Sequence, residues 1–238
     1  MNPAPKHRIE YGILRVLASV ACVLPYRAAL TVGWGLAWAA FHMARWRVPE
    51  ARRRIEEAFG DRFDEGAVRR IAWVSLRNFA FSLIEALRMP RMTRAWVERT
   101  TDCAAVEQVR TVLGEGRGAI LVIPHMGSWE TAGVAAALLG LPVFFIVGHQ
   151  KNPLVDAYAN RLRGITGVET IPRDAAALRK TVKNLREGRV LAFMTDLRSR
   201  TPGVAVRFLG RDANLVAGMG VFAKIAGAPV VQIGRAHV

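Results

Sequence analysis

The stretch that decides the fold is Gly118-Ala-Ile-Leu-Val-Ile-Pro-His125-Met-Gly-Ser-Trp-Glu130. Its apolar run from Ala119 to Ile123 is short, rich in β-branched residues and bounded by Gly and Pro, which predicts a buried strand. Ser128 can cap a helix that begins one or two residues later. His125 therefore lies between a strand end and a helix start, at the edge of an open α/β sheet where ligands bind.

The second chemical feature of this stretch is the pairing of His125 with Glu130. Glu130 lies in the first turn of the predicted helix and can point back at the imidazole. A carboxylate in that place fixes the tautomer and stabilises the imidazolium, which is how hydroxyl-activating sites orient a base. The alternative is a loop histidine beside an unrelated glutamate that the helix macrodipole favours. The spacing alone leaves both interpretations open.

Length and charge limit the classes of protein. The chain has 238 residues, enough for one α/β domain with an appendage and a sizeable core. It carries 34 basic against 19 acidic residues, a net charge of +15, which implies an anionic partner such as a membrane surface, nucleic acid or an acidic carrier protein. We expect no nucleic acid, because no zinc-ligand spacing, RNA-stacking motif or recognition-helix pattern is visible. Cys22 and Cys103 suggest no disulfide framework and fit a reducing compartment.

The N-terminal segment is almost wholly apolar from Tyr11 to Met43, interrupted only by Arg15 and Arg27. Its uninterrupted run Ala28–Met43 is 16 residues long, whereas a spanning helix needs about 20 apolar residues. We expect residues 1–48 to form a membrane anchor that spans the bilayer or lies half within it. The alternative is a buried helical hairpin of a soluble protein.

Tryptophan and arginine residues suggest how this segment is oriented. Trp34 and Trp38 share a helix face, and Trp favours the membrane interface. A basic cluster follows, formed by Arg45, Arg47, Arg52, Arg53 and Arg54. Basic residues beside an apolar segment mark the cytoplasmic side and favour anionic lipid. We therefore expect a location at the cytoplasmic (inner) membrane, with a catalytic domain that faces the cytoplasm. Residues 49–115 are expected to form a helical region that covers the sheet.

Strand and helix patterns alternate from residue 116 onward. The expected strands are Ala119–Ile123, Val143–Val147, Val168–Ile171, Val190–Met194, Val204–Phe208 and Pro229–Gln232. The expected helices are Glu130–Leu139, Pro153–Ile165, Ala175–Glu187 and Leu215–Ala226. This alternation predicts an α/β fold, a mixed sheet flanked by helices on both faces, over residues 116–232. Polar side chains gather near the predicted strand ends: Asn152, Arg161, Arg163, Arg173 and Asp196. Each of them also fits a solvated helix face or an ordinary turn.

The segment from His125 to Glu130 resembles the His-x4-Asp/Glu motif of the glycerolipid acyltransferase superfamily. More specifically, the chain looks like the lipid A biosynthesis (lauroyl/myristoyl) acyltransferases and the related phosphatidylinositol mannoside acyltransferases. Further stretches are similar in order and spacing: Asn152-Pro153 with Arg161-Leu-Arg163, Ile171-Pro-Arg173, Asp196, Gly203-Val-Ala-Val-Arg-Phe-Leu-Gly210 and Ala223-Lys-Ile-Ala-Gly-Ala-Pro-Val-Val231. The likeness covers nearly the whole chain. It departs at Leu197, where the family usually has Gln, and at Gln232, where Pro is usual, and both departures bear on substrate preference more than on the reaction.

The resemblance implies a membrane-associated acyltransferase that moves a fatty acyl group from an acyl carrier protein or coenzyme A thioester to a hydroxyl of a glycolipid such as a lipid A precursor. His125 is the expected base and Glu130 its orienter. The backbone near Gly127 is one source of oxyanion donors, and Arg163 and Arg173 are expected to hold acceptor phosphate. The remaining expected substrate-binding residues are Asn152, Arg161 and Asp196. We expect direct transfer without an acyl-enzyme, no cofactor beyond the thioester donor, and no metal.

Two alternatives belong to other functional classes. One is a lysophospholipid or glycerol-phosphate acyltransferase, and the other is a non-catalytic lipid-binding membrane protein, which the anchor and the basic charge also allow. An inert protein would not need both His125 and Glu130. No motif that we identify specifies the acyl length, the exact acceptor, the choice of donor or the oligomeric state.

The C-terminus carries a feature of a different kind. The chain ends in Ile233-Gly-Arg-Ala-His-Val238, and the family likeness stops at the same place, within an expected core strand. This hexapeptide is also the translation of ATC GGA AGA GCA CAC GTC, a common sequencing-adapter sequence. We therefore expect an artefactual tail over residues 233–238, a C-terminally truncated core, and no functional role for Arg235 or His237.

Overall fold

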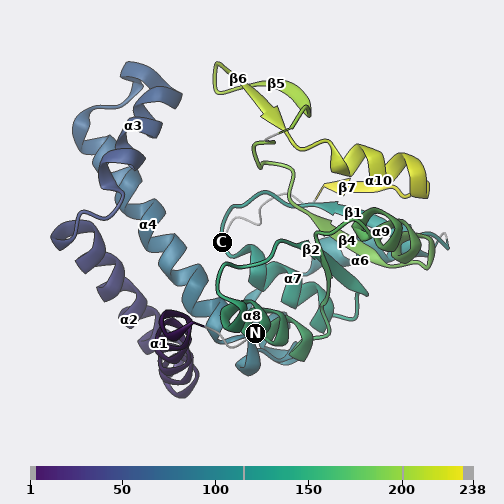
Figure 1. The fold of residues 1–238 in the computed structure, drawn as a ribbon, viewed down its shortest axis with the longest axis horizontal. Helices are drawn as coiled ribbons and strands as arrows, with labels where there is room; N and C mark the ends of the chain where they lie inside the picture. The colour runs from purple at the N-terminus through teal and green to yellow at the C-terminus, as the bar shows by residue number, and fades with distance from the viewer. Residues whose placement is uncertain (1–3, 115, 200, 233–238) are drawn as a thin grey trace.

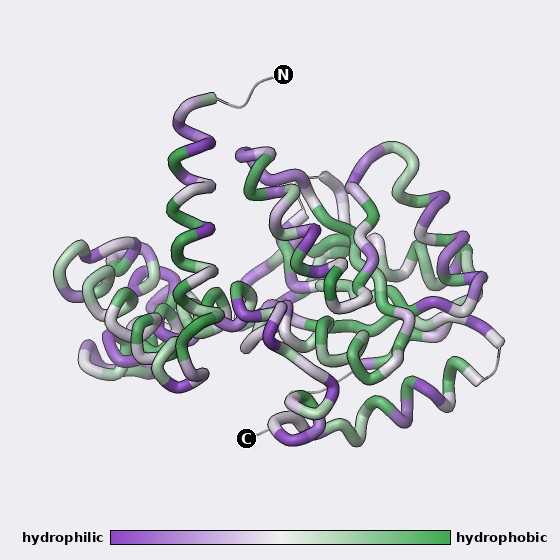
Figure 2. The backbone as a smooth tube through the Cα atoms, turned by 90° about the horizontal axis from the view of Figure 1, so that it is seen from below, coloured by the Kyte–Doolittle hydropathy of each residue, from purple (hydrophilic) through white to green (hydrophobic). Residues whose placement is uncertain are grey.

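The computed structural model describes residues 4–114, 116–199 and 201–232, so the expected tail over residues 233–238 lies outside the described residues. An α/β core lies beside a lobe of helices from the first part of the chain (Figure 1). Figure 2 shows the same two regions from below, with the N-terminal helix at the boundary between them. The core holds a five-stranded sheet of order β3-β2-β4-β1-β7. Its strands are β1 (Ala119–Val122), β2 (Val143–Val147), β3 (Glu169–Pro172), β4 (Val190–Phe193) and β7 (Val230–Gln232).

All five strands of this sheet pair in parallel. The expected α/β class with flanking helices is confirmed, but the expected mixed sheet is wrong for the described strands. The strand β5 (Val204–Phe208) lies outside the sheet and pairs antiparallel with β6 (Arg211–Leu215) in a separate hairpin. Leu209 and Gly210 close this hairpin with φ of 49° and 76°, the left-handed pair that a tight two-residue hairpin turn requires. The sequence did not predict β6 because its polar residues lack a strand-like alternation.

One face of the sheet packs against two helices from the second half of the chain. Ile120, Phe144 and Leu191 are fully buried and form a cluster with residues of α9 (Ala177–Arg186) and α10 (Gly218–Ala226). Burying a side chain of this size stabilises the fold by about 1.5–3 kcal/mol. This cluster therefore holds β1 at a fixed place in the sheet.

The opposite face is covered by two other helices. Leu121, Val143 and Val190 are buried in a cluster with residues of α6 (Ala104–Leu113) and α7 (Trp129–Leu138). Neighbouring residues of β1 thus point to opposite faces, and both faces are buried. This explains why the strands read as continuous apolar runs rather than as an alternating pattern.

The helical lobe precedes the sheet in the chain. Its elements are α1 (Pro5–Val23), α2 (Tyr26–Trp38), the π-helical turn η1 (Ala39–Met43), α3 (Val48–Phe59), the 3₁₀ turn η2 (Gly60–Arg62), α4 (Glu65–Leu87), the 3₁₀ turn η3 (Met89–Arg91) and α5 (Arg94–Thr100). The remaining core helix is α8 (Pro153–Ile165). Among the described helices, none combines the length and the apolar character that crossing a membrane requires.

The helix α1 presents an apolar stripe away from the protein. The stripe consists of Ile9, Ile13, Val16, Val20 and Val23, whose exposed fractions lie between 43% and 84%. Their spacing of four and three residues places them on one helix face. A helix of a globular domain normally turns such a face toward the core. The alternative of a buried helical hairpin is therefore wrong for this face.

Arg88 ties the α1–α2 hairpin to α4. It is buried, and its Nη1 donates to the carbonyl of Ala21 and, at 2.7 Å, to that of Leu24. These carbonyls belong to the C-terminal end of α1, where no further helix turn can satisfy them. Beside this contact, the Tyr26 hydroxyl donates to Glu85 at 2.6 Å, and burial together with this hydrogen bond raises the pKa of the Tyr26 phenol.

Candidate active site

Two neighbouring strands carry the site. Val122 at the end of β1 lies opposite Phe193 at the end of β4. His125 and Asp196 each follow their strand by the same short step, so parallel pairing carries both side chains to one place beyond the carboxyl edge of the sheet. Open α/β sheets bind ligands at this edge.

Both carboxylate oxygens of Asp196 contact His125. Oδ1 lies 2.7 Å from Nδ1 of the imidazole, and Oδ2 accepts from the backbone N–H of His125 at 2.7 Å. One carboxylate therefore fixes both the loop and the ring. A neutral imidazole that donates from Nδ1 to a carboxylate has its basic lone pair on Nε2. The two side chains are 30% and 39% exposed, as a site that admits a substrate must be.

The helical lobe supports the His125 loop. The ring of Trp129 meets the imidazole edge-on, with 5.4 Å between the ring centroids, and stacks against Phe79 of α4 at 6.4 Å. Ser82 of α4 donates to the carbonyl of Gly127 at 3.1 Å. Contacts from α4 thus hold the loop from the side opposite to the sheet.

Glu130 does not orient the imidazole, contrary to the sequence-based expectation. Its two carboxylate oxygens accept from Arg163 of α8, from Nε at 3.0 Å and from Nη2 at 2.6 Å. The reason lies in the packing of α7. Glu130 shares a helix face with Val134, and Val134 lies in one buried cluster with Leu162 of α8. That face therefore looks toward α8 rather than back toward His125.

The same ion pair changes the expected role of Arg163. Its Nε and Nη2 are bound to Glu130, and its Nη1 donates to Asn160 at 3.1 Å. The pair is largely buried, with side-chain exposed fractions of 15% and 23%, and a bidentate pair of this kind is strong and geometrically specific. Holding a phosphate would require breaking it, so Arg163 fixes α8 against α7 instead.

Asn152 is likewise used within the fold rather than exposed for a substrate. It is buried, and its Oδ1 accepts from the backbone N–H of Leu154, which caps α8. Its Nδ2 donates to the carbonyl of His7 and to Glu10, both at 2.9 Å. Asn152 thus joins the start of α8 to α1.

The other expected residues remain accessible. Arg161 on α8 and Arg173 after β3 are exposed, and neither forms an ion pair within residues 4–114, 116–199 and 201–232. Arg173 lies at the same sheet edge as His125, although two strands separate β3 from β1. Gly127 has a left-handed φ of 62°, and its N–H donates to no acceptor in the described part of the chain.

Asp196 is the residue whose role the sequence did not reveal. The family likeness predicts a substrate-binding residue, whereas the structure makes it the partner of His125. The signal that identifies it is the register of β1 and β4. That signal cannot be read from the sequence order, because β2 and β3 lie between these strands in the chain.

Comparisons with known proteins identify related sequences. A sequence profile described as bacterial lipid A biosynthesis acyltransferase matches residues 4–234. The chain is 25% identical over 162 residues to a phosphatidylinositol mannoside acyltransferase of Mycolicibacterium smegmatis, covering 67% of this chain and 53% of the relative. It is 25% identical over 164 residues to the protein of the same name from Mycobacterium tuberculosis, covering 66% of this chain and 51% of the relative.

The chain thus spans about half the length of these two relatives. The profile, in contrast, runs through the helical lobe as well as the sheet and includes the loops that carry His125 and Asp196. The protein therefore belongs to the bacterial lipid A biosynthesis acyltransferase family.

Proposed function

We propose that this protein transfers a fatty acyl group from an acyl thioester, carried by acyl carrier protein or coenzyme A, to a hydroxyl of a glycolipid at the cytoplasmic face of a membrane. The observation that supports this most directly is the 2.7 Å contact between Nδ1 of His125 and Asp196. A histidine held in this way presents Nε2 as a general base. Family membership supports the reaction class.

His125 activates the acceptor. A hydroxyl is a poor nucleophile near neutral pH until a positioned base takes its proton during attack. In the proposed reaction the hydroxyl oxygen bonds to the thioester carbonyl carbon while Nε2 takes the proton. The C–S bond then breaks, and the imidazolium returns the proton to the departing thiolate. Asp196 stabilises the imidazolium between these two steps.

The oxyanion that forms during attack needs hydrogen-bond donors. The N–H of Gly127 is the proposed donor, since it has no acceptor among the described residues and belongs to the loop that carries His125. The same loop leads into the N-terminus of α7, where the helix dipole favours negative charge. Both features stabilise charge that develops only in the transition state.

The proposed acceptor is a glycolipid that carries phosphate. The family description names lipid A biosynthesis, and the names of both relatives specify phosphatidylinositol mannoside. Both acceptors combine sugar hydroxyls with phosphate groups. Arg173 and Arg161 are exposed arginines that can bind such phosphates.

The exposed stripe on α1 supports association with a membrane surface. Apolar side chains that face away from the protein gain free energy when they enter the boundary between headgroups and acyl chains. The basic charge of the chain adds attraction to anionic lipid. We propose that α1 lies in this boundary and brings the site to its lipid substrate.

The test is an acyl-transfer assay on the full chain in lipid vesicles. Acyl carrier protein and coenzyme A thioesters are each offered with a lipid A precursor, a phosphatidylinositol mannoside or a lysophospholipid, and the products are identified by mass spectrometry. An acylated glycolipid from the wild type and from His149→Ala, but not from His125→Ala, is the expected result. His149 is the matched control because its side chain is exposed and its ion pair is with Asp156 rather than with Asp196. Absence of thioester consumption, or acylation of the lysophospholipid alone, would overturn the proposal.

A further inference from the structure

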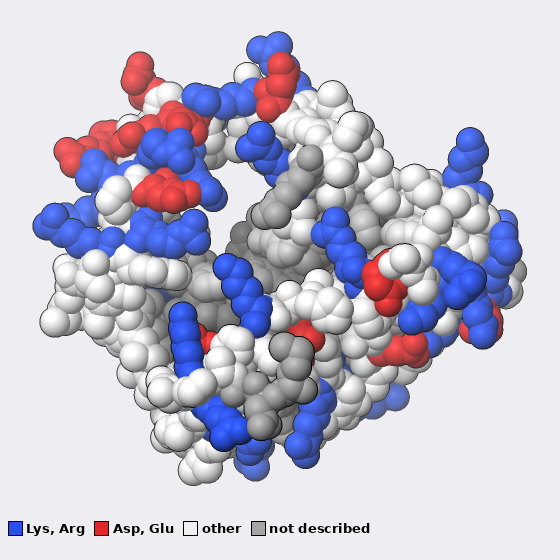
Figure 3. All heavy atoms as spheres, viewed as in Figure 1, with Lys and Arg blue, Asp and Glu red and all other residues white. Residues whose placement is uncertain are grey.

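A basic cavity lies in the helical lobe, apart from the His125 site. It has a volume of about 490 Å³ and lies between η1, α3 and the start of α4. Four arginines line it, namely Arg45, Arg52, Arg53 and Arg69, against two glutamates. Figure 3 shows many Lys and Arg side chains over this part of the molecule, with Asp and Glu side chains among them. None of the residues that line the cavity belongs to the loops that carry His125 and Asp196.

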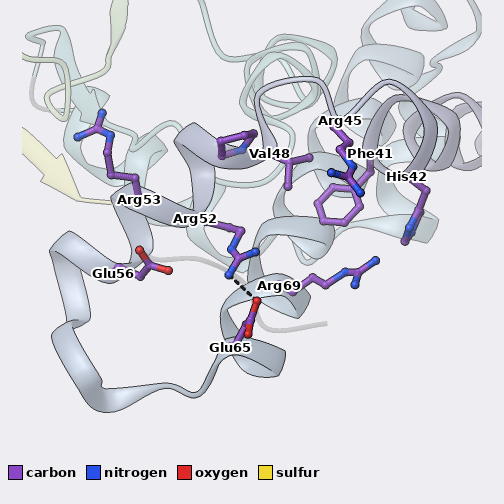
Figure 4. A pocket seen from close by; sticks show the side chains of 10 residues that line it. Phe41, His42, Arg45, Val48, Arg52, Arg53, Glu56, Glu65 and Arg69 are labelled. Atoms are coloured by element: carbon purple, nitrogen blue, oxygen red, sulfur yellow. Dashed lines mark hydrogen bonds and ion pairs between the residues drawn. The ribbon is translucent and has the colours of Figure 1, made fainter.

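Two of these arginines have no partner within the described part of the chain. Arg52 donates to Glu65 at 2.8 Å, and Arg53 pairs with Glu57. The side chains of Arg45 and Arg69 form no ion pair or hydrogen bond with any residue that the structure describes. Figure 4 shows Arg45, Arg52 and Arg69 approaching the cavity from three different segments. Arg45 and Arg69 are both exposed, so their guanidinium groups are accessible to an anion from outside.

The backbone that carries Arg45 is held in an unusual form. The π-helical turn η1 precedes it, and π-helical turns are frequent at functional sites. Arg45 and Arg47 both adopt left-handed φ, 49° and 56°. Such a conformation costs a non-glycine residue about 1–3 kcal/mol and recurs at ligand clamps. In this protein Arg45 belongs to the strained turn and lines the cavity.

The surroundings of the cavity indicate where the anion comes from. Trp38, Met43 and Trp46 belong to the same segment, and all three are exposed. Exposed Trp beside Arg is typical of the level of lipid headgroups, where the ring enters the interface and the cation meets phosphate. The exposed His42 and the buried Phe41 line the cavity with two aromatic rings, whose centroids are 5.0 Å apart. A soluble anion would not need this apolar rim.

We propose that this cavity binds the phosphate of an anionic lipid headgroup, with Arg45 and Arg69 as its main ligands and Arg52 beside them. A phosphomonoester is preferred over a diester, because its second charge and third terminal oxygen can engage more than one guanidinium. The site goes beyond acyl transfer, since it binds a lipid that is not consumed and fixes the lobe at the membrane surface.

The proposal is tested by vesicle binding, which requires no acyl transfer and therefore succeeds or fails independently of the proposed reaction. The full chain is sedimented with phosphatidylcholine vesicles that contain phosphatidic acid, a phosphomonoester, or phosphatidylglycerol, a diester. The variant is Arg45→Gln with Arg69→Gln. Its control, Arg62→Gln with Arg70→Gln, removes the same charge from exposed residues of the same lobe that do not line the cavity. Arg69→Gln alone and thermal unfolding of every variant separate loss of binding from loss of fold.

The expected result is a loss of phosphatidic acid binding in the cavity variant that exceeds the loss in the control by about tenfold or more, because specific hydrogen bonds are lost in addition to charge. Binding to phosphatidylglycerol should differ less between the two variants. Equal losses in both variants would show diffuse attraction and overturn the proposal. Displacement of the protein from vesicles by a low concentration of inorganic phosphate would show that the cavity binds free phosphate rather than a lipid. If the cavity variant lost binding to acyl carrier protein and kept its binding to vesicles, the ligand would be that protein rather than a lipid.

Discussion

At the scale of single residues, the site depends on which carboxylate meets which cation. Asp196 holds His125 through two contacts of 2.7 Å, while Glu130 neutralises the largely buried Arg163. The two acids therefore have different tasks. In the proposed reaction Asp196 acts on the imidazole that takes the proton, whereas Glu130 joins α7 to α8 through its ion pair with Arg163.

Replacement of the base is the first residue-scale prediction. His125→Ala should lower acyl transfer by about 10²–10⁴-fold, the contribution typical of a general base. Its fold should stay intact, because the imidazole is partly exposed and contributes little to the core. Initial rates of thioester consumption measure the effect, with far-UV circular dichroism as the check on folding. A variant that keeps a tenth of wild-type turnover would exclude His125 as the base.

Glu130→Gln should instead act on stability. Removing the negative charge leaves Arg163 with weaker acceptors in a largely buried place, and we expect a loss of about 1–3 kcal/mol in the free energy of unfolding. The control is Glu98→Gln in the exposed pair with Arg94, for which the loss should stay below about 0.5 kcal/mol. Urea unfolding measures both values. Equal losses for the two variants would contradict the role given to Glu130.

At the scale of elements, α1 carries the proposed contact with the membrane. Ile13→Ser with Val16→Ser should weaken binding to vesicles by about tenfold or more, because each of these side chains gains apolar burial in the interface. The fold should be unaffected, since both residues are exposed. Ile165→Ser with Val221→Ser is the control, because these residues are also exposed but lie on core helices. Identical binding of the wild type and the α1 variant would exclude the stripe as the membrane contact.

The attachment of α1 and α2 to α4 leads to a separate prediction. Arg88→Met leaves the carbonyls of Ala21 and Leu24 without their donor, and we expect a loss of about 2–4 kcal/mol in stability from these two acceptors. Limited proteolysis should then cut α1 faster than in the wild type. Arg91→Met, at an exposed residue of η3, is the control. Unchanged protease resistance of Arg88→Met would show that other contacts hold the hairpin.

At the scale of the whole molecule, the sequence predicted most of the core because local patterns determine it. The strands β1, β2 and β4 and the helices α7 and α8 lie within a residue or so of their expected bounds, since apolar runs, Gly and Pro mark them directly. The basic cavity and the pairing of Asp196 with His125 were not predicted. The pairing joins segments that are distant in the chain and become neighbours only through strand order. The cavity forms within residues 41–69, where it depends on how η1 and α3 pack against α4.

The partners of Asp196 and Glu130 likewise could not be predicted from local sequence patterns. The spacing of His125 and Glu130 correctly places one at a strand end and the other in the next helix. It does not define which way the helix faces, and that direction follows from the buried cluster that contains Val134 and Leu162. A motif therefore identifies the residues of a site more securely than their contacts.

The central claim is that Asp196, rather than Glu130, orients the catalytic base. Single-turnover acyl transfer by the wild type, Asp196→Asn and Glu130→Gln, measured well below the unfolding temperature of each protein, tests it most directly. We predict a fall of about 10²-fold or more for Asp196→Asn, because the amide cannot stabilise the imidazolium. For Glu130→Gln we predict a fall of less than about tenfold, as expected for an effect on packing rather than on the reacting group. The reverse order, with Glu130→Gln the more damaging change and Asp196→Asn close to wild type, would contradict the account.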